Sequence, residues 1–144
     1  MTGKGKKIAE KFWLDDEEKL KRLVALLKNE IDRITFDVEF RKEVLFKLWS
    51  KERVREPLIK VLHTRFFELG FENLILLPRK LEQKTEDFYR SLDDFIFYVT
   101  YTEDMPVTMK TRFEGHVKEL KNKAAIVFKE ISSLSLDEPS LSNK

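Results

Sequence analysis

Residues 14–50 read LDDEEKLKRLVALLKNEIDRITFDVEFRKEVLFKLWS, and this stretch decides the fold. Its apolar residues recur in alternating steps of four and three, the spacing that puts side chains on one face of a helix. No glycine or proline occurs between residues 6 and 56, and four acidic residues open the stretch, where the helix dipole favours negative charge. The repeat therefore predicts one helix from about residue 14 to 50, roughly 55 Å long. The repeating positions are Leu20, Val24, Leu27, Ile31, Ile34, Val38, Arg41, Leu45 and Leu48, of which only Arg41 is not apolar.

The middle of this helix carries a second pattern. Residues 34–40, ITFDVEF, alternate apolar and polar side chains as an amphipathic strand would. We favour the helix because the four-three repeat crosses this segment without a change of phase, and because no turn-forming residue flanks it. A shorter helix followed by a strand is the alternative.

A second helix is expected after Pro57, since proline suits the first turn of a helix. Gly70 is a natural end for it, because glycine favours the position just past a helix C-terminus. The segment that follows, LILLP at 74–78, fits either a short buried helical turn or a short strand. The apolar stripe of the second helix comprises Leu58, Val61, Leu62, Phe66 and Leu69.

Two further apolar repeats follow, separated by a loop at 102–106. The third repeat comprises Leu81, Thr85, Phe88, Leu92, Phe95 and Val99. The fourth comprises Phe113, Val117, Leu120, Ala124, Val127, Ile131 and Leu134. Both keep the four-three spacing and predict helices. A β-hairpin over 95–113 is the alternative, because FIFYVTY at 95–101 has high strand propensity and VTMKTRF at 107–113 alternates; Gly115 would then start the last helix.

These repeats predict an all-α protein, an antiparallel three- or four-helix bundle with coiled-coil-like heptad packing. The alternative is an α+β fold with the hairpin at 95–113. We expect a basic N-terminal lead at 1–13, in which Phe12 and Trp13 anchor onto the body, a helical domain at 14–134 and a disordered tail at 135–144.

Composition excludes several classes of protein. The chain has no cysteine, which rules out disulfides and thiolate metal sites and fits a cytoplasmic location. No apolar run reaches the ~20 residues of a membrane span, and the basic N-terminus lacks the apolar region of a secretory signal. The net charge of +2 predicts no strong general attraction to nucleic acid. Charged residues make up 38% of the chain, which raises the hypothesis of a thermophilic source.

Charge is unevenly distributed along the chain. Residues 41–60 hold seven basic and three acidic side chains, and residues 82–104 hold seven acidic and two basic ones. The two segments could face one another within the fold or across a dimer, or each could be a solvated face. Such complementarity sets register and partner choice more than affinity.

No stretch carries a catalytic, cofactor-binding or metal-binding motif, so we predict no catalytic, cofactor or metal residues. His63 and His116 have no second histidine or carboxylate at metal-ligand spacing, although each has cations nearby that would suit a phosphotransfer module. Structural, half-exposed histidines are the simpler interpretation.

The seventeen aromatic residues and four apolar stripes exceed what one narrow seam per helix needs. We therefore expect a non-enzymatic structural, adaptor or self-assembling protein that acts by association with a protein partner or a second copy. A nucleic-acid or phosphate-binding accessory protein using the basic segment at 41–60 is the alternative, since aromatics among the cations could stack on bases. The candidate interaction residues are Arg41, Lys42, Phe46, Lys47, Trp49, Arg53, Arg55, Phe66, Phe67 and Phe71.

Overall fold

The computed structural model describes residues 15–134, and every regular element in that range is helical. The all-α prediction is confirmed, and the hairpin alternative is wrong. The expected lead at 1–13, with Phe12 and Trp13, and the expected tail at 135–144 lie outside the described residues. The elements are α2 (Asp16–Ser50), α3 (Glu56–Leu62), the 3-10 helix η1 (Phe66–Glu68), α4 (Phe71–Leu74), α5 (Arg79–Tyr101) and α6 (Pro106–Ser133).

Helix α2 is a single 35-residue helix, as the apolar repeat predicts. The Asp15 side chain caps it by accepting a hydrogen bond from the Glu18 backbone N–H at 2.8 Å. The strand alternative at 34–40 does not occur. Its alternation arises because the helix buries Ile34 and Val38 while Phe36 and Phe40 lie stacked on the exposed side.

The second helix is shorter than predicted. It ends at Leu62 and does not continue to Leu69, because Arg33 of α2 donates to the carbonyls of Val61 (3.5 Å) and His63 (2.9 Å). The chain then forms η1 and α4, and Gly70 begins α4 instead of ending a helix. The segment at 74–78 completes a helical turn, and of its side chains only Leu77 is buried.

Helices α5 and α6 follow the third and fourth repeats. All six predicted seam positions of α5 are buried, and five of the seven on α6 are buried, while Ile131 and Leu134 are partly buried. The loop between them closes at Pro106, the first residue of α6. Residues 95–101 are helical despite their strand propensity, because one side of this helical segment packs against a core that includes Trp49 and Phe113.

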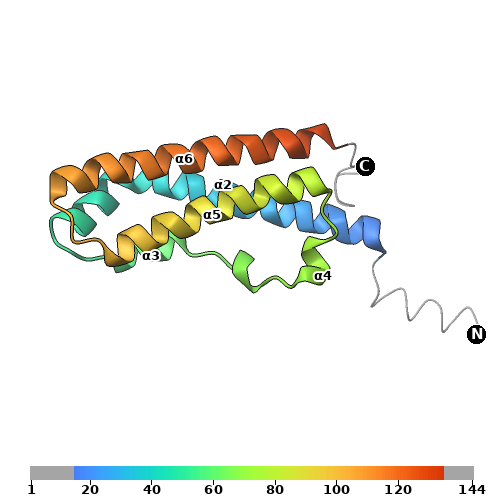
Figure 1. The fold of residues 1–144 in the computed structure, drawn as a ribbon, viewed down its shortest axis with the longest axis horizontal. Helices are drawn as coiled ribbons and strands as arrows, with labels where there is room; N and C mark the ends of the chain where they lie inside the picture. The colour runs from blue at the N-terminus through green and yellow to red at the C-terminus, as the bar shows by residue number, and fades with distance from the viewer. Residues whose placement is uncertain (1–14, 135–144) are drawn as a thin grey trace, which may run out of the picture.

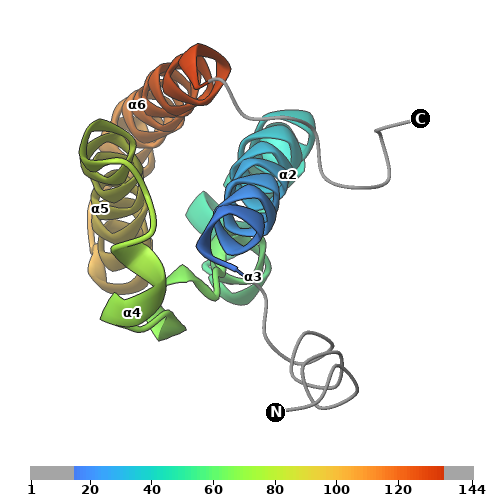
Figure 2. The ribbon, with the colours of Figure 1, turned by 90° about the vertical axis from the view of Figure 1, so that its right-hand side faces the viewer.

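The long helices lie side by side (Figure 1). Helix α6 contacts both α5 and α2, and α3 contacts α2 and α5. Figure 1 shows that α6 runs antiparallel to α2 and α5, which run in the same direction. The segment 51–78, which connects α2 to α5, runs back along the molecule, so that α5 can start again at the same end as α2. In the end-on view of Figure 2, α6 lies on one side and the segment with α3 and α4 on the other.

Gly115 lies in the interior of α6, where a Cβ atom would meet no atom within 4 Å. Replacing it by alanine is expected to raise the free energy of unfolding by about 0.5–1 kcal/mol, because alanine loses less backbone freedom on entering a helix. Urea unfolding followed by circular dichroism measures this change. A Gly115→Ala variant less stable than the parent would contradict an exposed, unhindered helical position.

Candidate functional site: a lysine-rimmed groove between α2 and α6

A groove of about 660 Å³ opens between the C-terminal half of α2 and the N-terminal half of α6. Its apolar floor is formed by Phe46 of α2 and Phe113 of α6, whose ring centroids lie 5.3 Å apart, with Pro106 and Val107 beside them. We call it the lysine-rimmed groove. Its lining residues are Lys42, Glu43, Phe46, Lys47, Lys51, Pro106, Val107, Lys110, Phe113 and Glu114.

The rim of the groove carries an excess of positive charge. Four lysines and two glutamates line it, and Lys47, Lys51 and Lys110 have no ion pair within the described part of the chain. Unpaired cations of one sign around an apolar floor raise the local concentration of anionic groups. The side chain of Val107 is 81% exposed at the first turn of α6, so part of the apolar surface is open to a partner.

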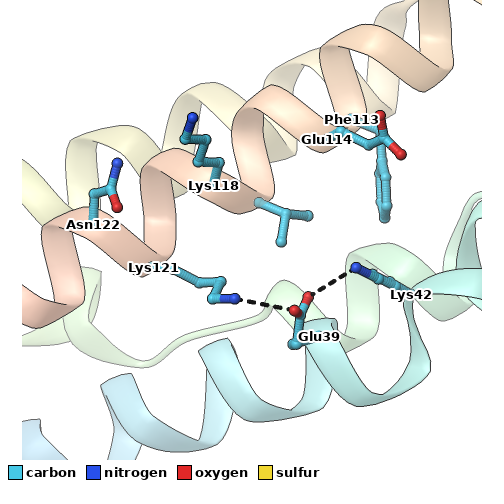
Figure 3. A pocket seen from close by; sticks show the side chains of 8 residues that line it. Glu39, Lys42, Phe113, Glu114, Lys118, Lys121 and Asn122 are labelled. Carbon is cyan, nitrogen blue, oxygen red and sulfur yellow. Dashed lines mark hydrogen bonds and ion pairs between the residues drawn. The ribbon is translucent and has the colours of Figure 1, made fainter.

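The groove continues along α6 into a smaller hollow of about 290 Å³. Figure 3 shows Glu39 of α2 between Lys121 of α6 and Lys42 of α2. The Lys121 ammonium donates to Glu39 Oε1 at 3.0 Å, and the Lys42 ammonium lies 3.5 Å from Oε2. The hydrogen bond from Lys121, with the charges of both lysines, lowers the pKa of Glu39. Glu39 therefore stays ionised and ties α2 to α6 in the hollow beside the groove, while Lys118 lines this hollow without an ion pair among residues 15–134.

Three of the ten predicted interaction residues, Lys42, Phe46 and Lys47, line the groove. Arg41 is exposed on α2. Trp49 is buried and donates its indole N–H to the Val99 carbonyl at 3.1 Å, so it has no free ring face for a base or a partner.

The other predicted residues lie elsewhere. Arg55 donates to the carbonyls of Val99, Thr100 and Thr102 at the end of α5, and Arg53 lies 3.5 Å from the Asp104 carbonyl. These two cations therefore bind the segment after α2 to the C-terminal end of α5 and the loop that follows it. Phe66 is buried against Tyr89, whereas Phe67 and Phe71 are exposed in the segment of η1 and α4.

The contribution of α6 to the groove was missed from the sequence. Val107, Lys110 and Phe113 were assigned only to a helical seam or to a strand of the alternative hairpin. Their pairing with Phe46 joins residues more than sixty positions apart and depends on α6 lying against α2. Lys51, at the C-terminal end of α2, was also absent from the predicted interaction residues, although it belongs to the basic segment at 41–60.

The two histidines occupy different environments. His116 is half-buried, stacked on Phe95 with ring centroids 4.8 Å apart and tilted against Tyr98 at 5.4 Å. Burial lowers the pKa of His116, although the nearby Glu119 and Asp94 carboxylates act in the opposite direction. His63 is exposed at the end of α3, where its carbonyl accepts from Arg33. The His116 ring therefore serves as an aromatic packing element.

The depressed pKa of His116 predicts a stability that depends on pH. As the pH falls from 7 to 5, the unfolded chain binds a proton at this residue before the folded protein does, so the free energy of unfolding should fall. In His116→Phe this decrease should be smaller, whereas His63→Gln should keep it. Urea unfolding at pH 7, 6 and 5 measures the three slopes. Equal slopes for the parent and His116→Phe would contradict the prediction.

Among residues 15–134 no group of three or more His, Asp or Glu side chains is placed to hold a metal ion. Within the same range, none of the helices combines the length and the apolar character that crossing a membrane requires. Comparison with protein-family models, with curated proteins and with solved structures finds no match to this chain.

Proposed function

We propose that the protein is a small, non-enzymatic association module that binds an acidic, apolar segment of a protein partner in the lysine-rimmed groove. The observation that carries this proposal is the apolar floor of Phe46, Val107 and Phe113 inside a rim of four lysines, three of which have no ion pair among residues 15–134. An amphipathic helix with acidic flanks has the complementary chemistry, since such helices bind by laying an apolar face into a groove.

The floor and the rim have different roles. Burying one large apolar side chain contributes about 1.5–3 kcal/mol, whereas an exposed ion pair contributes about 0–1 kcal/mol. The floor would therefore supply most of the affinity, and the lysines would select acidic partners and speed their approach.

We further propose that the scaffold of this module is an antiparallel helical bundle of four segments with coiled-coil-like packing. The supporting features are the four-three repeats of α2, α5 and α6 and the return of residues 51–78 along the molecule. In this arrangement the broken segment of α3, η1 and α4 takes the place of the second antiparallel helix.

The proposal is tested with a designed 18-residue amphipathic peptide that has leucine and phenylalanine on one face and glutamate on its flanks. A peptide of the same composition, with the apolar residues scattered, serves as its control. Fluorescence anisotropy should show binding of the first peptide only. The double charge reversal Lys47→Glu/Lys110→Glu should weaken it about tenfold or more, because two attractions become repulsions.

A matched variant, Lys28→Glu/Lys129→Glu, makes the same charge change on exposed positions of the same two helices, away from the groove. At the same ionic strength, its affinity for the peptide should equal that of the parent. Equal binding by both variants would overturn the groove as the site.

Nucleic acid is the alternative ligand, and the same variants distinguish nucleic-acid binding from binding of a protein segment. A labelled 20-nucleotide single strand in a gel-shift series at rising salt should show only weak, general binding, since Trp49 is buried and unavailable for stacking. Oligonucleotide binding tighter than peptide binding, and lost in Lys47→Glu/Lys110→Glu, would overturn the protein-partner proposal.

A further inference from the structure

The solvent-facing side of α5 carries acidic and aromatic side chains in one stripe. Apart from Asp94, which directly follows Asp93, its residues follow steps of four and three, so they share a face of the helix. We call this stripe the α5 ridge. It comprises Glu86, Arg90, Asp93, Asp94, Phe97 and Tyr101, all exposed.

The ridge ends in an exposed aromatic pair. Phe97 is 65% and Tyr101 67% exposed, and their ring centroids lie 4.9 Å apart. Every buried seam residue of α5 lies on the opposite side, so the core does not explain this pair. Two large aromatic side chains together on the outer face of a helix are typical of a contact surface.

The acids of the ridge have no partner within the described part of the chain. Glu86, Asp93 and Asp94 make no ion pair there, and Arg90 supplies the one positive charge of the stripe. The ridge is therefore negative and apolar, while the lysine-rimmed groove is positive and apolar. Their charges are complementary.

The two surfaces also match in length and order. The ridge covers residues 86–101, about 22 Å of helix, and the groove with its adjoining hollow runs along 106–122 of α6, about 24 Å. The ridge has aromatics at one end and acids about one to three turns away. The groove has Val107, Lys110 and Phe113 at one end. Along α6 these are followed by Lys118 and by Lys121, which pairs with Glu39 of the same copy.

One copy cannot fill its own groove with its own ridge. The groove is bounded by α2 and α6, whereas the ridge lies on α5 opposite to the side chains that α5 buries in the core. Figure 2 shows α5 beside α6 and separate from the outer side of the α2–α6 pair. A contact between ridge and groove therefore joins two molecules head to tail.

We infer that the acidic partner of the groove is a second copy of this chain, whose α5 ridge lies along α2 and α6. This inference rests on the proposed function of the groove and names its occupant. Phe97 and Tyr101 of one copy would cover the floor at Phe46 and Phe113 of the next. Because one copy then keeps a free groove and the other a free ridge, the contact is heterologous and extends into chains or closes into a ring.

The test is sedimentation velocity of the full chain over a wide concentration range at low salt. The parent should form larger species as its concentration rises. The ridge variant Asp93→Lys/Phe97→Ser and the groove variant Lys47→Glu/Lys110→Glu should each remain monomeric to at least tenfold higher concentration. All four positions are exposed, and circular dichroism checks that each variant keeps its helices. The control Phe71→Ser/Glu72→Lys makes the same change in an exposed aromatic–acid pair elsewhere and should associate like the parent.

Mixing the two variants gives the sharpest result. The ridge variant keeps a working groove and the groove variant keeps a working ridge, so an equimolar mixture should form a dimer and nothing larger. A mixture that stays monomeric would overturn the inference. Association of the parent that survives both pairs of substitutions would also overturn it, since the interface would then lie elsewhere.

The same data separate this inference from the proposed function. A parent chain that is monomeric at every concentration, yet binds the designed peptide through Lys47 and Lys110, would refute the second copy and keep the groove. A groove that binds neither the peptide nor the ridge would refute both.

Discussion

Replacing Trp49 by alanine is expected to lower the free energy of unfolding by about 3–5 kcal/mol, the range for removing a large aromatic from a core. Only 1% of Trp49 is exposed, and its ring contacts Phe46, Tyr98 and Phe113 at centroid distances of 6.0, 5.7 and 5.9 Å. Its indole N–H also donates to the Val99 carbonyl at 3.1 Å. One side chain thus joins the C-terminal ends of α2 and α5 to the start of α6.

Urea unfolding followed by circular dichroism measures the effect, and Trp49→Phe is the control. Phenylalanine keeps much of the apolar contact but lacks the N–H donor, so the free energy of unfolding of Trp49→Phe should fall by less, about 1–2 kcal/mol. The Val99 carbonyl keeps its hydrogen bond from Arg55 at 3.0 Å, which limits that loss. A Trp49→Ala variant within 1 kcal/mol of the parent would show that Trp49 does not hold these three helices together.

The long helices could be predicted from the sequence because each one buries a single continuous face. In α5 the spacing of Leu81, Phe88 and Val99 alone identifies the buried side. Arg41 marks the limit of that argument. It occupies a seam position by spacing, yet it is exposed, and the core of α2 passes from Val38 to Leu45 without it.

The return segment at 51–78 could not be predicted in the same way, because side chains distant in sequence determine where its helices end. The carbonyls of Val61 and His63 accept from Arg33, about thirty residues earlier in the chain. The apolar stripe through Phe66 and Leu69 therefore looked helical, although the backbone bonds that would continue α3 are replaced by bonds to α2. Local periodicity carries no information about such a partner.

The candidate site was predicted in part. The basic segment and Phe46 pointed to α2, and Lys42 and Lys47 do line the groove. Trp49 and Arg55 share the same local composition but have internal partners, since the indole and the guanidinium both bind the Val99 carbonyl. Local composition does not distinguish a cation that is free to bind a ligand from one that caps a neighbouring helix. Only the tertiary arrangement distinguishes them.

Replacing Glu30 by alanine is the second change expected to have a large effect, about 2–4 kcal/mol of lost stability. The Glu30 carboxylate accepts hydrogen bonds from the hydroxyls of Tyr89 (2.8 Å) and Thr64. The Thr64 oxygen accepts in turn from the Phe66 N–H at 3.1 Å, and the Phe66 ring stacks on Tyr89 at 3.8 Å. Glu30 thus joins α2, α5 and the segment between α3 and η1.

Most of this loss should come from the hydroxyls that alanine leaves without an acceptor, because an unsatisfied buried donor costs about 1–3 kcal/mol. Tyr89 and Thr64 are both buried. Burial raises the pKa of Tyr89, as does its hydrogen bond to the Glu30 carboxylate, so its hydroxyl remains a donor at neutral pH. Glu30→Gln keeps an acceptor oxygen and should lose only about 1 kcal/mol.

A double-mutant cycle isolates the Tyr89 contribution. Tyr89→Phe alone should cost about 1 kcal/mol, since it removes the donor and leaves the stacking on Phe66 in place. Combined with Glu30→Ala it should cost less than the sum of the two single changes, because the orphaned hydroxyl is then absent. Additive losses in urea unfolding would show that the two side chains act independently. Coupling of about 1 kcal/mol or more would show that this polar contact joins α2 to α5, the two helices that carry Glu30 and Tyr89.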